Sequence, residues 1–247
     1  MNFPEELNFP KECKVDRVIP KKDFYEAGFK TSDKNIFTNN VKQIKWLYYL
    51  KEDNIQIPPY TDEEKDYTEL EVLTLTLKKD NKIERICELI HRFIPYPILL
   101  IITYHEKTML SVAHKRNSKK EEDAVTLTDM RYTDWIEDET PTEFALKLID
   151  NLKFENLDKQ NMYTLYSDIV NKIIQYNGSR YAGEELSIPV EKIKEINNQI
   201  ISLNKKIEII KYEIKKETQF NKKLEMNMKI KDMKNEIEKL EEELLGN

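Results

Sequence analysis

The stretch Ile94–Arg116, IPYPILLIITYHEKTMLSVAHKR, decides the fold of this chain. Its two prolines cannot donate a backbone hydrogen bond, so they end the preceding segment and turn the chain. The apolar run 98–104 that follows is typical of a strand buried on both faces. A short connection near Glu106 leads into a second strand, 109–114. The stretch therefore predicts a β-hairpin whose first strand lies at the centre of a sheet.

The sequence on either side of this hairpin extends the sheet. Residues 70–79, LEVLTLTLKK, alternate as a strand does, and residues 83–94 carry an amphipathic helical stripe. A strand joined to the next strand through a helix predicts two parallel neighbours. Residues 125–135, VTLTDMRYTDW, alternate again. The fold class predicted is α+β, with a mixed sheet of about four strands and packed helices.

Two further helices are predicted ahead of the sheet. Residues 21–29, KKDFYEAGF, form a short one, which Gly28 terminates. Residues 38–53, TNNVKQIKWLYYLKED, place apolar side chains at helical spacing after a short polar residue suited to an N-cap. Both segments are therefore predicted to pack as helices against the strands.

The domain organisation follows from where these patterns begin and end. Residues 1–20 are polar and contain three prolines, which predicts an extended N-terminal arm with little regular structure. Residues 21–176 form the α+β domain, which ends in helices. Two of the four glycines fall in residues 177–190, which predicts a linker. Residues 191–247 form a helical tail.

The tail carries apolar residues with an alternating spacing of three and four, which is typical of a coiled coil. We call this row of apolar residues the seam. Its spacing is interrupted after residue 214, and apolar residues begin again at Met226 in a different heptad register. No Gly or Pro marks a turn there, which favours one continuous helix, and the alternative is a hairpin that turns at KETQFNKK. Either a second copy or the hairpin has to cover the seam, and we predict a homodimer. The seam residues predicted to form the interaction surface are Ile193, Ile196, Ile200, Leu203, Ile207, Ile210 and Ile214.

Composition restricts the function. The 247-residue chain has a formal net charge of -6, which is unfavourable for coating nucleic acid, so we expect contact with nucleic acid to be weak or indirect. Cys13 and Cys87 are isolated, which gives no disulfide or zinc pattern, and Cys87 is predicted to be a buried, inert thiol. No apolar run is long enough for a membrane span and no signal peptide is visible, so a soluble, cytoplasmic protein is expected. No motif predicts a cofactor or a metal.

Three residues are the candidates for chemistry, namely Glu71, His105 and Lys115. A nuclease of the restriction-enzyme type needs a carboxylate on one strand and a Glu-x-Lys on the next, because the carboxylates hold the metal. Glu71 supplies a carboxylate and Lys115 the lysine, but Ala113 stands where the second carboxylate is required. His105 and His114 lie at the two ends of the hairpin, where polar side chains are usually solvated.

Several stretches together resemble a bacterial family catalogued as domain of unknown function 4391. They are VIPKKDFYEAGF at 18–29, VKQIKWLYYLKEDNIQI at 41–57, the strand and IPYP hairpin at 70–104, and DMRYTDW at 129–135. The resemblance covers roughly residues 15–175 and supplies no catalytic set. It implies a gene neighbourhood of helicases and DNA methyltransferases in phage defence or restriction–modification.

Two hypotheses on function follow. The first is a non-enzymatic assembly or adaptor subunit, in a phage-defence or restriction–modification system, with a helicase or a methyltransferase as the partner that the resemblance implies. The second is a metal-dependent nucleic-acid processing enzyme with a degenerate nuclease-like site at Glu71, His105 and Lys115. A group of carboxylates or imidazoles that converge in space favours the enzyme, and a dispersed set favours the adaptor.

Overall fold

The computed structural model describes residues 3–26, 28–117 and 125–246. The chain divides into two compact units, residues 1–173 and residues 174–247, and the division falls inside one helix, α7 (Met162–Ala182). We call the first unit the body and the second the hairpin unit, and each is described by itself.

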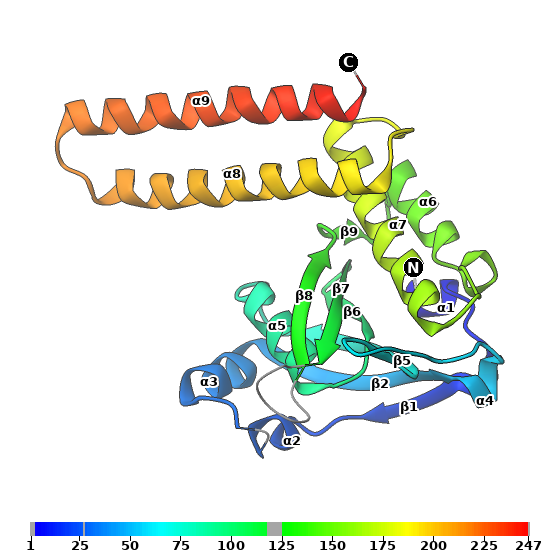
Figure 1. Ribbon diagram of the computed structural model, residues 1–247. Helices are drawn as coiled ribbons and strands as arrows, with labels where there is room; N and C mark the ends of the chain where they lie inside the picture. The colour runs from blue at the N-terminus through cyan, green and yellow to red at the C-terminus, as the bar shows by residue number, and fades with distance from the viewer. Residues whose placement is uncertain (1–2, 27, 118–124, 247) are drawn as a thin grey trace. The chain divides into compact units, whose positions relative to one another are not determined.

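The body is built on a mixed sheet (Figure 1). Among the described residues this sheet has seven strands in the order β1-β2-β5-β6-β7-β8, with β9 paired to β7. The α+β class is therefore confirmed, and the sheet is wider than the four strands expected from sequence. Its strands are β1 (Lys14–Val18), β2 (Val41–Lys51), β5 (Glu69–Leu77), β6 (Ile98–Tyr104), β7 (Lys107–Asn117), β8 (Val125–Tyr132) and β9 (Ile136–Glu137). A separate pair comprises β3 (Tyr60–Thr61) and β4 (Asp66–Tyr67).

The centre of the sheet is the hairpin predicted from sequence. β6 pairs with β5 in parallel, and α5 (Ile83–Phe93) connects the two strands. β6 then pairs with β7 antiparallel, with Tyr104 opposite Lys107. Ile98 to Ile102 are all at most 1% exposed, although consecutive side chains of a strand point to opposite faces. The prediction of a central strand buried on both faces is therefore confirmed.

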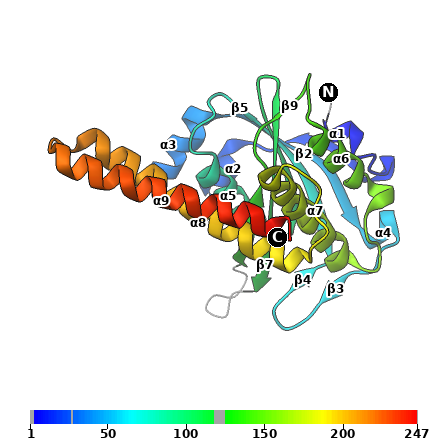
Figure 2. The same cartoon turned by 90° about the horizontal axis from the view of Figure 1, so that it is seen from above.

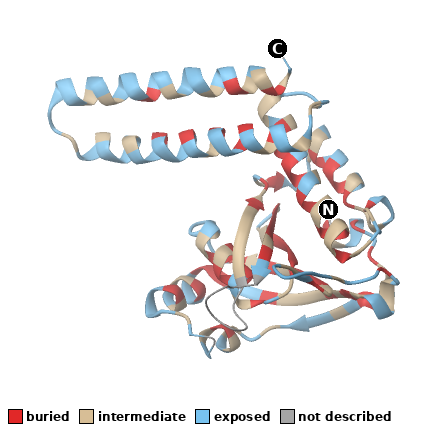
Figure 3. Cartoon of the chain, viewed as in Figure 1, coloured by how far each residue is buried: buried red, intermediate tan, exposed pale blue. Residues whose placement is uncertain are grey.

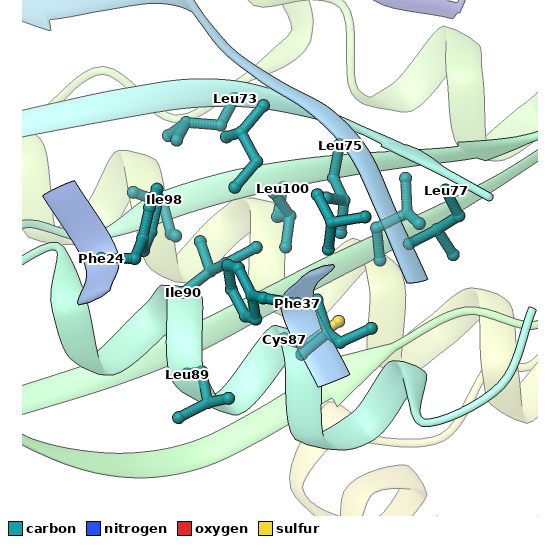
Figure 4. Close-up of a cluster of buried hydrophobic side chains, with 14 of the residues drawn as sticks. Phe24, Phe37, Leu73, Leu75, Leu77, Cys87, Leu89, Ile90, Ile98 and Leu100 are labelled. Atoms are coloured by element: carbon teal, nitrogen blue, oxygen red, sulfur yellow. The ribbon is translucent and has the colours of Figure 1, made fainter. Parts of the chain in front are cut away.

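Helices cover both faces of this strand. On one face α5 packs with α2 (Lys21–Glu26) and α3 (Thr31–Asn40) over leucines and isoleucines of β5 and β6, as Figure 4 shows. On the other face, the Tyr166 hydroxyl of α7 donates to the carbonyl of Ile98 at 2.9 Å. It also accepts from the amide of Ala113 at 2.9 Å. The body therefore has an apolar core on each side of the sheet.

The helix predicted at residues 38–53 is wrong, because Val41–Lys51 is the strand β2. The buried side chains of β2 include Val41, Ile44 and Tyr48, a spacing of three and four that imitates a helix. Two register shifts in the pairing with β5 cause this spacing, because each displaces the side chains that follow. The β-branched and aromatic residues of this segment agree with a strand.

The N-terminal segment is more regular than an extended arm. It forms α1 (Phe3–Glu6), a 3-10 turn (Lys11–Cys13) and β1, which pairs with β2 at the edge of the sheet. Its apolar side chains explain the order, because Phe3, Leu7 and Cys13 are each at most 1% exposed. The prolines separate these short elements instead of keeping the segment unstructured.

The remaining elements of the body are short, apart from α7. They are α4 (Glu52–Ile55), α6 (Glu143–Asn151) and a 3-10 turn (Phe154–Asn156). Thr142 caps α6, because its hydroxyl accepts from the amide of Ala145 at 3.3 Å. α7 continues to Ala182, so residues 177–182 are helical where a linker was expected.

The hairpin unit consists of the end of α7, then α8 (Val190–Lys216) and α9 (Phe220–Leu244). Figures 1 and 2 both show α8 and α9 side by side and antiparallel. A salt bridge of 3.3 Å from Lys192 to Glu243 joins the start of α8 to the end of α9. The continuous helix favoured from sequence is therefore wrong, and the alternative hairpin is the observed form. Glu217 ends α8 in an extended conformation and its carboxylate accepts from two amides of the turn, at 2.7 and 2.9 Å.

Candidate functional site

Buried polar side chains gather on the α5 side of the central strands. Glu71 belongs to β5, Ser111 and Lys115 belong to β7, and His91 belongs to α5; none is more than 8% exposed. The strand residues share the face of Leu73, Leu75 and other core residues that pack on α5, because alternate positions of a strand point the same way. The sheet thus holds two ionisable groups inside the core, Glu71 and Lys115, and α5 adds a third, His91.

Lys115 hydrogen-bonds backbone carbonyls beside the two prolines of the turn. Its ammonium nitrogen donates to the carbonyl of Ile94 at 2.5 Å and to the carbonyl of Tyr96. Ile94 is the residue at which α5 ends, where carbonyls lack a partner within the helix. Lys115 therefore connects the proline turn to β7. Burial lowers the pKa of Lys115 to about 7, and the nearby Glu71 carboxylate opposes this shift.

Glu71 forms the other half of an electrostatically coupled pair. Burial raises the pKa of Glu71 to about 7, and the charge of Lys115 opposes this shift. Such a pair is able to exchange protons near neutral pH, which is the property required of an acid–base catalyst. The two residues are only 8% and 4% exposed, however, so a substrate has little access to either. The geometry supports a structural role for both.

His91 and Ser111 form a second polar contact beneath α5. The Nε2 atom of His91 lies 3.0 Å from the Ser111 hydroxyl, and burial holds the pKa of His91 well below its usual value, so the ring is neutral. Among the described residues, the Nδ1 atom has no hydrogen-bond partner. Cys87 lies one helical turn before His91, and burial raises the pKa of its thiol to about 12. The predicted burial of Cys87 is confirmed, and the raised pKa of the thiol agrees with an inert group.

The contact between His91 and Ser111 was not predicted from sequence, although the spacing of the residues indicates it. His91 follows Cys87 by four residues and so lies on the apolar stripe of the helix, and Ser111 precedes Lys115 by four residues on the same face of a strand. The histidine considered instead, His105, lies in the two-residue turn between β6 and β7 with a backbone φ of 51°. The structure therefore brings Glu71 and Lys115 together and leaves His105 at the turn.

His114 belongs to a tyrosine cluster on the opposite face of the sheet. Its Nδ1 atom lies 2.7 Å from the hydroxyl of Tyr67, which also accepts from the amide of Lys115 at 3.2 Å. The ring of Tyr166 lies 5.5 Å from the imidazole, and that of Tyr163 lies 5.8 Å away. These contacts join β4, β7 and α7, so the cluster holds the α7 face of the body together.

A surface hollow of about 360 Å³ lies beside α3 and α5. Arg85 lines it and donates to both carboxylate oxygens of Asp33, at 3.0 and 2.8 Å. Arg85 and Arg92 also bind the two oxygens of Glu88, at 2.7 and 3.0 Å. The carboxylates that pair with these guanidinium groups make the hollow a poor anion site, and the bidentate pair fastens α3 to α5.

In the hairpin unit, the predicted interaction seam is turned inward. Ile193, Ile196, Ile200, Leu203 and Ile207 are at most 6% exposed, and Figure 3 shows buried residues on the facing sides of α8 and α9. Ile210 and Ile214 are half-buried. The seam residues nearest the N-terminal end of α8 are therefore covered by the unit itself, and coverage weakens toward the turn.

Exposed apolar side chains gather near that turn. Seven large hydrophobic residues of the described chain are strongly exposed, and five of them lie between residues 209 and 228. The seam pattern does not predict this cluster, because these residues lie off the seam. The five are Ile209, Tyr212, Phe220, Leu224 and Met228, with exposed fractions from 53% to 76%.

The described residues offer neither a metal cluster nor a membrane-spanning helix. Among residues 3–26, 28–117 and 125–246, no group of three or more His, Cys, Asp or Glu side chains is placed to hold a metal ion. Within the same part of the chain, no helix is both long and apolar enough to cross a membrane. The nuclease-like alternative therefore lacks a recognisable metal cluster in the described residues.

Comparison with known proteins identifies a family. No curated protein and no solved structure matches the chain. A family model, described as a domain of unknown function (DUF4391), matches residues 7–237, which takes in the body and most of the hairpin unit. The chain therefore belongs to the DUF4391 family, as the sequence resemblance indicated.

Proposed function

We propose that this protein is a non-enzymatic assembly subunit, whose hairpin unit presents the surface that binds a partner. The observation that carries the proposal is the cluster of exposed apolar side chains between Ile209 and Met228. Exposed apolar residues are ordinary when single, whereas a concentration of them marks an interaction site. A partner that buries one such side chain fully gains about 1.5–3 kcal/mol.

The buried polar groups of the body support the same proposal. The ammonium group of Lys115 is engaged by two backbone carbonyls, and Glu71 lies beside it in the core. An enzyme would be expected to hold such groups in an accessible cleft. Of the three groups proposed from sequence for catalysis, Lys115 instead connects the proline turn to β7.

We further propose that the assembly belongs to a bacterial phage-defence or restriction–modification system and works in the cytoplasm. The support is the gene neighbourhood that the family resemblance implies, in which helicases and DNA methyltransferases are the expected partners. The net charge of -6 favours a protein that reaches nucleic acid through a partner instead of by itself.

The homodimer stays a prediction, but the uncovered seam no longer argues for it as strongly. It was predicted because the seam of the tail required a cover, but α9 covers most of the seam on α8, in a packing that we propose to be an antiparallel coiled coil. Light scattering of the full chain tests the dimer. A mass that stays monomeric at micromolar concentration would contradict it.

The experiment that tests the proposed function is capture of the native complex. The tagged full chain is recovered from its own cells after mild crosslinking, and mass spectrometry measures partners and their stoichiometry. We expect a stoichiometric partner that is lost with Leu224→Glu. The matched control is Leu146→Glu in the body, because both leucines are 53% exposed. Recovery of the chain alone, or equal loss of the partner with both variants, would contradict the proposal.

A further inference from the structure

The hairpin unit separates its charges along its length. We define the distal half as residues 205–234, which flank the turn, and the proximal half as residues 190–204 and 235–247. The distal half has ten lysines and five acidic residues, hence a net charge of +5. The proximal half has three lysines and seven acidic residues, hence -4. The exposed apolar cluster thus lies in a basic segment of an acidic chain.

The exposed residues lie on the outer faces of both helices. Successive residues of a helix are rotated by about 100°, so positions two residues from a seam residue point away from the seam. Ile209 and Tyr212 each come two residues after a seam residue, 207 and 210 respectively. Both therefore lie on the outer face of α8. Phe220, Leu224 and Met228 recur every four residues along α9, also away from α8. The distal half therefore offers apolar side chains on two sides.

The hairpin unit of a second copy does not satisfy this surface. Two distal halves that meet would match their apolar side chains but would bring +5 against +5. A distal half against a proximal half would match the charges. The outer face of proximal α8, however, carries Glu191, Lys194, Asn198 and Ser202, which are polar. Neither arrangement covers the apolar residues and compensates the lysines together.

The same surface is poorly suited to nucleic acid or to a bilayer. Residues 181–247 contain no arginine, which is the side chain best suited to phosphate and base contacts. A bilayer surface covers one side of an amphipathic element, whereas the distal half is apolar on two sides. A protein groove is able to enclose both sides.

We propose that the distal half inserts into an apolar groove, rimmed by acidic residues, on a different protein. This inference rests on the proposed function and adds the chemistry of the partner. The exposed aliphatic and aromatic side chains of the distal half fill the groove of the partner. Lysines of the distal half, such as Lys222 and Lys229, face the acidic rim. The charges steer association and set its salt dependence.

A panel of defined probes tests this chemistry with the full chain. The first probe is a synthetic amphipathic helix with leucine on one face and glutamate on the others. The second is the same peptide with lysine in place of glutamate, the third a DNA duplex, and the fourth a phosphatidylglycerol vesicle. Fluorescence anisotropy of the labelled peptides and DNA, and cosedimentation with the vesicles, measure binding. We expect the acidic peptide to bind at least about tenfold more tightly than any other probe.

Variants locate the binding site and separate the outcomes. Leu224→Glu should weaken binding of the acidic peptide by at least about tenfold, while the equally exposed Leu146→Glu leaves it unchanged. Circular dichroism checks that both variants stay folded. Failure of the acidic peptide while the native partner is still captured would overturn this inference and leave the proposed function standing. Tighter binding of DNA or vesicles, or a dimer that Leu224→Glu dissociates, would also overturn it.

Discussion

The body and the hairpin unit treat apolar and polar residues in opposite ways. At the centre of the body, β6 is apolar on both faces and buried on both, and charged groups such as Lys115 are drawn into the core to bind backbone carbonyls. In the distal half of the hairpin unit, large apolar side chains are exposed and lysines surround them. A side chain's type therefore tells little about its role until its burial is known.

The difference separates residues that maintain the fold from residues that are free to bind. A buried apolar residue stabilises the body, and its loss leaves a cavity. An exposed one contributes little to stability, so its presence has another reason. Substitutions that measure stability and binding separately are expected to divide along this line.

The largest effect on stability is expected for Ile101→Ala in β6. Ile101 is fully buried, so the variant should lower the free energy of unfolding by about 2–5 kcal/mol. Urea denaturation followed by circular dichroism measures it. Leu224→Ala is the contrasting change in the hairpin unit and should alter the unfolding free energy by less than about 0.5 kcal/mol. Similar losses in the two variants would mean that the comparison fails.

A smaller loss is expected for Gly178→Ala, in the tightly packed contact between α7 and α8 of the hairpin unit. A Cβ atom on Gly178 would lie 2.5 Å from Cγ2 of Ile193 and 2.8 Å from Cδ1 of Leu186. Overpacking of this kind costs about 1–3 kcal/mol. Alanine gains about 1 kcal/mol over glycine in helix propensity. Thermal unfolding should therefore show a net loss.

The control for this change is Ser179→Ala, which is in the same helix and should be neutral or slightly stabilising. A second substitution tests the cause. Ile193→Leu removes the Cγ2 methyl from the contact, so Gly178→Ala should be less destabilising in that background. An equal loss in both backgrounds would point to some other cause.

Sequence patterns predicted the fold best where they are regular. The β6–β7 hairpin and the parallel pair through α5 follow from strand alternation and an amphipathic stripe. β2 was missed because two register shifts replace the spacing of two by a spacing that resembles a helix. The turn at Glu217 lies in KETQFNKK, the alternative that was not favoured because the segment lacks Gly and Pro. The Glu217 carboxylate accepts the backbone hydrogen bonds of this turn, so glycine is not needed.

The candidate sites were harder to predict than the fold. Glu71 and Lys115 were named from sequence, but their proximity depends on the register of β5, β6 and β7, which the sequence does not state. The burial that changes their pKa values is likewise a product of tertiary packing. The exposed cluster on α8 and α9 lies off the seam, and only the antiparallel arrangement shows that the described part of the hairpin unit leaves those outer faces exposed.

The next effect is a pH dependence that belongs to the body. The pKa of Glu71 rises from 4.5 to about 7 on folding, so its contribution to stability is present below pH 4.5 and is lost as pH rises toward 7. The pKa of Lys115 falls from 10.5 to about 7, so stability is gained as pH rises from 7 toward 10.5. Together the two groups predict a minimum in their contribution near pH 7.

Urea unfolding of the wild type and of Glu71→Gln at a series of pH values isolates the carboxyl group. The stability of the wild type relative to the variant should fall between about pH 4.5 and pH 7, by at least about 1 kcal/mol, since one pKa unit corresponds to 1.36 kcal/mol. Leu224→Glu provides the comparison in the hairpin unit and should not reproduce that fall. A difference that is flat with pH would show that Glu71 is not desolvated.

The smallest effect concerns the two histidines at the ends of the β6–β7 hairpin. His114 is half-buried and hydrogen-bonds Tyr67 at 2.7 Å, so His114→Ala should cost about 0.5–1.5 kcal/mol. His105 adopts a φ of 51°, a conformation that glycine accepts without a steric penalty. His105→Gly should therefore be neutral or stabilising by up to about 1 kcal/mol. Thermal unfolding of both variants measures these changes in stability. A larger loss for His105→Gly than for His114→Ala would contradict the assignment of His114 to the packing of the body and of His105 to the turn.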